Sequence, residues 1–231
     1  MKKGLFIVID GADGAGKATQ AKKLIERLKK NEVPTVYVDF PRYETFFGKT
    51  IARFLRGEFG DLKTVSPYLA SIPYALDRQG TRTLIESALN SGKYVIANRF
   101  VSSNMAHQAA KIANKKDRSK YLDWVSKLEY QVLGVPKENI VVYLKMSEPI
   151  ASRLVDKKGQ RQYLRGKVKD IHEEDSLYQR SVADLYLKLA KKHRWIVIKC
   201  YDKGEPLSIN VIHDKIVKKL QLLSMMPKNL R

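Results

Sequence analysis

Five short runs of apolar residues recur along the chain, at positions 5–9, 35–38, 94–97, 140–144 and 195–198. Apolar and polar residues do not alternate within these runs. Continuous apolar character is typical of strands that are buried on both faces of a parallel sheet. The pattern therefore predicts five buried parallel strands.

Longer amphipathic stretches separate these runs. In residues 18–30, Ala21, Leu24 and Leu28 lie at helical spacing and lysines occupy the other face. Further helices are expected over 47–57, over 66–90 as two or three, over 101–133 as two, and over 170–192 and 208–223. Strands that alternate with helices predict a doubly wound α/β fold. No linker divides the chain, so residues 1–231 are expected to form one domain.

The charge balance is strongly basic. The chain has 44 lysines and arginines against 24 aspartates and glutamates, a formal net charge of +20. Such an excess suits a polyanionic partner, either nucleic acid or phosphorylated small molecules. The basic residues are scattered, without a block of five like charges, which favours the interpretation as solvated helix faces. Nucleic acid is therefore an unlikely partner on this evidence.

Other features of the composition exclude several classes of protein. One cysteine, Cys200, leaves no intrachain disulfide or Cys–Cys metal motif. No run approaches the roughly 18 apolar residues of a membrane span. Only five apolar residues lie between Gly4 and Asp10, too few for a secretory signal. We expect a cytoplasmic protein that does not contact a membrane.

The first strand is followed by a segment with the spacing of a phosphate-binding loop, G-x-x-x-x-G-K-[S/T]. Glycines in such a loop let backbone N–H groups turn toward phosphate oxygens, and the next helix adds its positive end. The lysine bridges the outer phosphates. The ATP-binding residues expected here are Gly11, Ala12, Asp13, Gly14, Ala15, Gly16, Lys17, Ala18 and Thr19.

Ala18 stands where the loop usually has a hydroxyl that binds Mg²⁺. Asp13 is the nearest carboxylate and would hold the metal directly or through water, because Mg²⁺ tends to keep several waters. ATP and Mg²⁺ are thus the expected co-substrate and cofactor.

Three further groups of residues, at 40–43, 75–78 and 98–104, follow the second strand, lie in a helix and follow the third strand. Together with residues 11–20 they resemble the thymidylate kinase family, over most of residues 4–200. The resemblance is greatest to bacterial members that lack an arginine in the phosphate loop, here Gly14, and carry basic residues in a lid instead. A basic segment at about 153–169 would be that lid, although a solvated loop explains it as well.

The resemblance implies a role for each matching residue. The catalytic residues would be Asp13, Lys17, Arg99, Arg161 and Arg165, the last two from the lid. The dTMP-binding residues would be Phe40, Pro41 and Arg42 in the monophosphate pocket, Tyr74 stacked on thymine, Arg78 at its O4, Arg99 on the acceptor phosphate, Ser103 and Asn104 at the base edge, His107 near the sugar, and Asp170 and His172 in a D-x-Y-E-like segment.

Departures from the family pattern occur at three of these positions. Asn98 replaces the usual aspartate, which bears on metal binding, and His107 and His172 stand where relatives have tyrosines, which bears on sugar selectivity. Residues 170–173 also have the pattern of a helix start, with an acidic cap and Glu173 three residues on.

The chemistry of Arg78 supports the choice of base independently. A guanidinium only donates hydrogen bonds, so it suits the carbonyl at position 4 of a pyrimidine and opposes the amino group of cytosine. The sequence therefore predicts a P-loop kinase that phosphorylates dTMP to dTDP with ATP. The resemblance also implies a homodimer. The alternatives are another nucleoside monophosphate or deoxynucleoside kinase and, less favoured, a nucleic-acid-binding P-loop NTPase.

Overall fold

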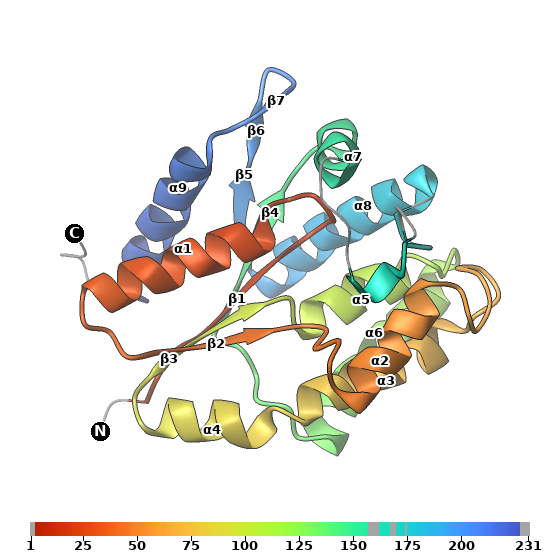
Figure 1. Ribbon diagram of the computed structural model, residues 1–231, viewed down its shortest axis with the longest axis horizontal. Coiled ribbons are helices and arrows are strands. Elements are labelled where there is room, and N and C mark those ends of the chain that lie inside the picture. Colours follow the sequence, from red (N-terminus) through yellow and green to blue (C-terminus); the bar gives the residue numbers. More distant parts are fainter. Residues whose placement is uncertain (1–2, 157–161, 167–169, 174, 227–231) are drawn as a thin grey trace.

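A five-stranded parallel sheet forms the centre of the molecule in the computed structural model, which describes residues 3–156, 162–166, 170–173 and 175–226 (Figure 1). The strands are β1 (Phe6–Gly11), β2 (Thr35–Asp39), β3 (Tyr94–Asn98), β4 (Ile140–Lys145) and β5 (Ile196–Lys199). They lie in the order β2-β3-β1-β4-β5, with β1 at the centre. The prediction of five parallel strands is confirmed. Burial on both faces holds for β1, β3 and β4, whereas the edge strands β2 and β5 are partly exposed and buried and exposed residues alternate along β5.

The central strand shows why these runs are continuously apolar. Phe6 and Val8 pack into one hydrophobic cluster, whereas Ile7 and Ile9 pack into the other, and all four are fully buried. Successive side chains of a strand point to opposite faces, and helices cover both faces of this sheet. An alternating pattern would have left one face polar.

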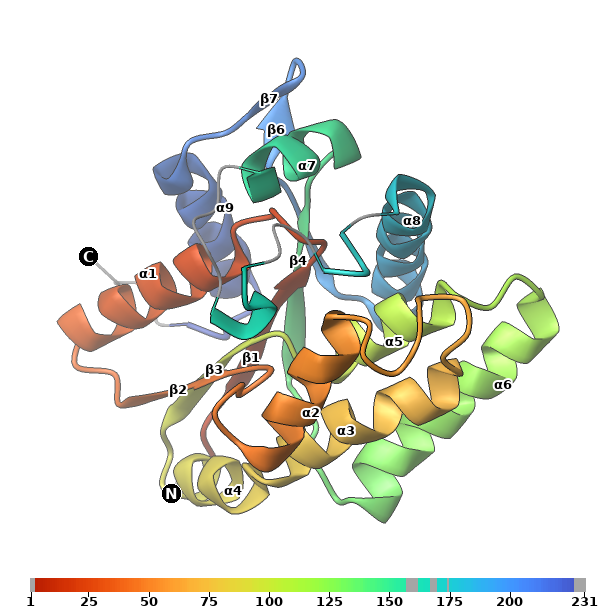
Figure 2. The same cartoon turned by 45° about the vertical axis from the view of Figure 1, so that its right-hand side comes forward.

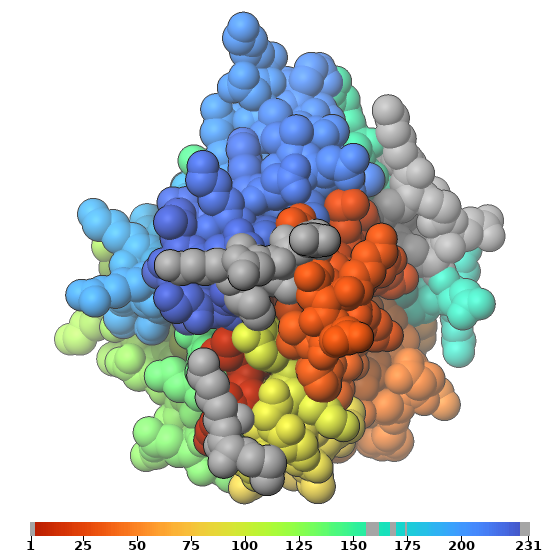
Figure 3. Space-filling model, turned by 90° about the vertical axis from the view of Figure 1, so that its left-hand side faces the viewer, coloured from red at the N-terminus to blue at the C-terminus, as the bar shows by residue number. Residues whose placement is uncertain are grey.

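Helices cover the sheet on its two faces. One face carries α1 (Lys17–Lys30), α7 (Glu148–Asp156) and α9 (Ile209–Leu222), and the other carries α4 (Arg82–Asn90), α5 (Val101–Ala109), α6 (Lys115–Ser126) and α8 (Ser176–His193). Figure 3 shows α1 and α9 side by side on the first face. No helix of the described residues is long and apolar enough to cross a membrane.

A third, smaller core lies beyond the edge of the sheet. It joins α2 (Phe46–Leu55) to α3 (Pro67–Gln79) through Ile51, Phe54 and Ala70. The short 3₁₀ turn η2 (Gln162–Leu164) packs against α2 (Figure 2). The guanidinium of Arg56, directly after α2, donates to the carbonyl of Tyr163 at 2.6 Å. This turn belongs to the segment predicted as a basic lid.

Some predicted boundaries are wrong. The helix expected over 170–192 begins only at Ser176, because Asp175 caps it by accepting from the backbone N–H of Tyr178. Residues 170–173 form a turn instead, in which Asp170 and Glu173 exchange side-chain-to-backbone hydrogen bonds. The expected loop also starts later than predicted, because α7 continues to Asp156.

Helix α7 and the short strands β6 (Tyr201–Asp202) and β7 (Glu205–Pro206), which form a hairpin after β5, are among the elements that were not predicted. The helical prediction over 101–133 holds at its end, but there α6 continues as a π-helical turn, η1 (Lys127–Val132). The two strands are too short to leave a period in the sequence.

Candidate active site

The phosphate loop connects β1 to α1 at the carboxyl edge of the sheet. Gly14 and Gly16 adopt left-handed backbone conformations, with φ of 80° and 81°, which other residues rarely adopt. Lys17 begins α1, and its Nζ donates to the carbonyl of Ala12 at 2.9 Å while lying 3.8 Å from the Asp13 carboxylate. The lysine thus lies over the loop that it is expected to serve.

Asp10, the one acid of the buried strand β1, connects the elements that meet at the start of this loop. Its fully buried carboxylate accepts hydrogen bonds from the hydroxyls of Ser102, Ser103 and Tyr186 and from the backbone N–H of Gly11. These donors come from β1, α5 and α8. The cluster therefore fixes α5 and α8 to the start of the phosphate loop.

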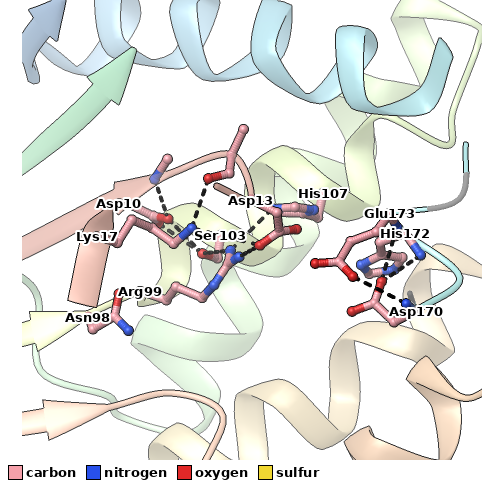
Figure 4. A network of polar contacts seen from close by, with 12 residues as sticks. Asp10, Asp13, Lys17, Asn98, Arg99, Ser103, His107, Asp170, His172 and Glu173 are labelled. Carbon is pink, nitrogen blue, oxygen red and sulfur yellow. Dashed lines mark hydrogen bonds and ion pairs between the residues drawn. The ribbon is translucent and has the colours of Figure 1, made fainter. Parts of the chain in front are cut away.

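Arg99 joins the phosphate loop to the substrate side of the site. Its guanidinium pairs with the Asp13 carboxylate, donates to the Ser103 hydroxyl at 3.2 Å and lies 3.3 Å from Nε2 of His107 (Figure 4). Burial by itself would lower the pKa of Arg99, but Asp13, Tyr186 and Asp10 together outweigh it and the pKa is raised. A permanent positive charge therefore sits beside Asp13.

The backbone of Arg99 is also unusual. Its φ of 60° lies in the left-handed region, where a non-glycine residue is strained by roughly 1–3 kcal/mol. The N–H of Arg99 donates to the carbonyl of Ile9 at 3.0 Å, which anchors this conformation to the central strand. Such strain at the end of a strand marks a position where side-chain direction matters.

A cavity opens from Arg99 toward α3 and α5. Most of the predicted substrate residues line it. These are Phe40, Pro41, Tyr74, Arg78, Arg99, Ser103, Asn104, His107, Asp170 and His172. The structure thus brings together residues that are far apart in the sequence.

The far end of the cavity is formed by a buried polar group. Arg78 donates through Nε and Nη2 to the two carboxylate oxygens of Glu129, both at 2.6 Å. Asn104 donates through Nδ2 to Glu129 at 3.0 Å and to the carbonyl of Ser71 at 3.2 Å. Burial would lower the pKa of Arg78, but the charge and hydrogen bonds of Glu129 together with the charge of Asp77 outweigh it and the pKa is raised.

A third polar group faces Arg99 across the site, where Figure 4 places Asp170, His172 and Glu173. The ring of His172 stacks on that of His107 with centroids 5.6 Å apart. Burial lowers the pKa of His172 to about 3, with Lys111 and Arg99 adding to the effect. Burial and the neighbouring carboxylates of Glu173 and Asp13 raise the pKa of Asp170 to about 7.

Three predicted positions, Arg42, Arg165 and Asn98, lie elsewhere in the part of the chain that the structure describes. Arg42 is not among the residues that line the cavity, because its guanidinium pairs with Asp77 at 3.0 Å. Arg165 is exposed beside η2, and Arg161 lies outside the described residues. Asn98 donates to Asp39 at 2.7 Å, so one of its amide hydrogens is used in a contact between the ends of β3 and β2.

Asp10 and Glu129 are the residues of this site that sequence reasoning missed. Asp10 had a signal, since it is the one charged residue in an otherwise apolar strand. Glu129 had none, because an acid between Leu128 and Tyr130 looks like a solvated helix position until its partners are known.

The donor set allows a magnesium ion next to bound nucleotide. Asp10 already accepts four hydrogen bonds, and no group of three metal-ligating side chains occurs within the part of the chain that the structure describes. Asp13, which also pairs with Arg99, is the carboxylate of the phosphate loop, so phosphate oxygens and water would have to complete the shell around a metal that it holds. Such a site depends on the nucleotide.

The parallel sheet, the loop with Lys17 at the start of α1 and the adjoining cavity define the chain as a P-loop kinase of the α/β class. The family model for thymidylate kinase matches residues 9–216, so the chain belongs to the thymidylate kinase family.

Individual relatives agree with this family. Thymidylate kinase from Mycobacterium tuberculosis (strain ATCC 25618 / H37Rv) is 32% identical over 198 residues, covering 84% of this chain and 91% of that protein. Thymidylate kinase from Plasmodium falciparum (isolate 3D7) is 27% identical over 227 residues, covering 98% and 94%. The structure of thymidylate kinase from Candida albicans shares the fold, with a TM-score of 0.73 at 21% identity and coverage of 96% and 93%.

Proposed function

We propose that the protein transfers the γ-phosphoryl group of ATP to dTMP, giving dTDP and ADP. The observation that carries this proposal is one cavity lined by Asp13 and Arg99, next to Lys17 of the phosphate loop, and by Arg78 and Asn104. The first pair suits a phosphate, and the second offers hydrogen bonds to a base. Membership of the thymidylate kinase family supports the same assignment.

In the reaction an oxygen of the acceptor phosphate attacks the γ-phosphorus, and the bond from that phosphorus to the β,γ-bridging oxygen breaks. The transferring group spreads negative charge over its oxygens, so catalysis consists largely of positioning and charge stabilisation. Arg99 in the cavity and Lys17 in the adjoining phosphate loop supply positive charge on either side of Asp13. Asp13 holds Arg99 in place by the ion pair between them.

Bound Mg²⁺ would neutralise further charge on the phosphates, with Asp13 as its protein ligand. Arg161 and Arg165 act from the basic lid, because Gly14 leaves the phosphate loop without an arginine. This lid assignment rests on the resemblance to bacterial members of the family.

Two further properties belong to the same proposal. The protein acts in the cytoplasm, which the composition supports, and it forms a homodimer, which the family resemblance supports. Phe46 at 79% and Leu69 at 65% exposure, on α2 and α3, are apolar side chains that a subunit contact would cover.

A coupled assay of ADP release tests the proposed function. We expect a higher kcat/KM for dTMP than for dCMP, AMP or thymidine, with dUMP reduced only modestly because one methyl group separates it from dTMP. Higher kcat/KM for dCMP or AMP would show that the protein is a different nucleoside monophosphate kinase. ADP release that depends on single-stranded DNA would indicate a nucleic-acid-dependent NTPase.

A further inference from the structure

Glu129 is placed to determine which hydrogen-bonding groups the cavity presents to a base. It is fully buried and accepts from two different side chains, Arg78 and Asn104, that line the cavity. It comes from the π-helical turn η1, which packs against α3, the helix that carries Arg78. π-Helical turns are rare in proteins, and those that occur often lie at functional sites.

The contacts of Asn104 fix the direction of its amide group. Both hydrogens of Nδ2 are used, one toward Glu129 and one toward the carbonyl of Ser71. The reversed amide would place Oδ1 against a carboxylate and a carbonyl, where acceptors would face each other without a proton between them. Asn104 is therefore left with Oδ1, a hydrogen-bond acceptor, as its remaining group.

Arg78 is fixed in the same way by the other contacts of Glu129. Its Nε and Nη2 edge is held by the carboxylate, which leaves Nη1 as a donor at the cavity wall. The cavity then offers a donor from Arg78 next to an acceptor from Asn104. A 4-oxo-pyrimidine presents a carbonyl next to an N3–H and matches this pair, whereas cytosine presents an amino group next to a bare N3 and opposes it.

We propose that Glu129 is the positioning residue for base specificity, because one carboxylate sets the donor of Arg78 and the acceptor of Asn104 at the same time. This inference rests on the proposed function, since it concerns the base of the acceptor nucleotide. A carboxylate is required rather than an amide, because only a group with acceptors on both oxygens satisfies Arg78 and Asn104 together.

The substitution Glu129→Gln tests this role with little change in shape. Glutamine has only one acceptor oxygen, so either orientation places its NH₂ against a donor: Nε of Arg78, or Nη2 of Arg78 together with Nδ2 of Asn104. The hydrogen-bonding groups of Arg78 and Asn104 would then leave the positions that the carboxylate holds. We expect kcat/KM for dTMP to fall and the dTMP-to-dCMP ratio of kcat/KM to drop at least about tenfold, since polar mismatches in a buried site discriminate strongly. The KM for ATP should stay within about twofold of wild type.

Glu138→Gln is the matched control. Glu138 also follows α6 and accepts a hydrogen bond, from Tyr130 at 2.8 Å, but Tyr130 does not line the cavity, unlike Arg78 and Asn104. Its substitution should leave the dTMP-to-dCMP ratio unchanged. Because the ratio compares two acceptors on one preparation, an inactive fraction of the protein cancels out.

An unchanged ratio in Glu129→Gln, with lower thermal stability alone, would overturn the proposal and leave Glu129 a structural residue. If that variant does not fold, Glu129→Asp replaces it: its carboxylate is too short to reach both partners, so the ratio should fall at least about threefold. An unchanged ratio there also overturns the proposal. Wild-type protein that did not prefer dTMP would instead refute the proposed function.

Discussion

Asp170 and His172 lie two residues apart, and burial shifts their pKa values in opposite directions. The pKa of Asp170 is raised to about 7 and that of His172 is lowered to about 3. Burial disfavours the charged form of either group, which is the anion for aspartate and the cation for histidine. At neutral pH the substrate side of the site therefore holds a neutral histidine and a carboxyl close to its titration point.

These shifts predict how stability depends on pH. Folded Asp170 binds its proton more tightly than the unfolded chain does, so its contribution is complete below about pH 4 and is lost as the pH rises toward 7. The free energy of unfolding of Asp170→Asn minus that of wild type should therefore increase by roughly 1–3 kcal/mol when the pH is raised from 5 to 8. Urea unfolding at both pH values measures this.

His172 acts with the opposite sign, since its contribution is complete above about pH 6.5 and is lost as the pH falls toward 3. It is present in wild type and variant alike and cancels from their difference. Asp175→Asn is the control, because asparagine caps α8 as well as aspartate does. A difference between Asp170→Asn and wild type that is the same at both pH values would contradict the prediction.

Single residues also show how far the sequence reaches into the site. Lys17, Asp13 and Arg99 could be predicted because a loop pattern and a family motif depend on residue type and spacing. Arg78 could be predicted as a cavity residue, but its partner Glu129 could not, since 51 residues separate them in the chain and the contact exists only once α6 packs beside α3. Pairing across the fold leaves no periodic signal.

At the scale of elements, the phosphate loop depends on its contact with α7. A Cβ atom added to Gly14 would lie 2.3 Å from the carbonyl of Ala151, in the middle of that helix. A side chain at this position therefore requires the loop and α7 to move apart. This offers a structural reason for glycine here, besides the difference between branches of the family.

Gly14→Ala should therefore be more destabilising than the strain of its backbone alone. A left-handed φ costs an L-residue about 1–2 kcal/mol, and overpacking adds about 1–3 kcal/mol. Gly166→Ala is the matched control, because Gly166 has φ of 93° but nothing within 4 Å of the added Cβ. We expect losses of about 2–5 kcal/mol for Gly14→Ala and about 1–2 kcal/mol for Gly166→Ala in urea unfolding. Equal losses of stability in the two variants would show that α7 moves away from the added side chain at no energetic cost.

Strands were easier to predict than helix boundaries for a physical reason. Burial on both faces leaves no ambiguity in a run such as residues 140–144, and each predicted strand agrees with the structure to within two residues at either end. The start of α8 was placed too early because Asp170 and Glu173 make the hydrogen bonds of a helix cap around a turn that no helix continues. Local sequence can specify a cap, but packing decides whether a helix follows it.

For the whole molecule, the basic side chains that give the net charge of +20 are not concentrated at the active site described above. Within the cavity, Arg78 is paired with Glu129 and Arg99 with Asp13. Outside it, a groove between α6 and α8 gathers Lys115, Arg118, Lys188 and Lys192 around leucines, with no aromatic residue in its lining. Single-stranded nucleic acid is usually held by aromatic stacking as well as by charge.

We therefore predict that the protein binds single-stranded DNA only through its diffuse charge. At about 0.15 M salt, fluorescence anisotropy with a labelled oligonucleotide should show no binding tighter than the non-specific range of about 10⁻⁴–10⁻⁶ M. At low salt, weak binding should appear and fall linearly with the logarithm of salt concentration, without affecting kcat/KM for dTMP. Tight binding near physiological salt, or DNA that competes with dTMP, would mean that the basic groove or the cavity serves nucleic acid. The absence of both would assign the excess lysines to solvated helix faces, where they act on solubility and on the approach of anionic substrates.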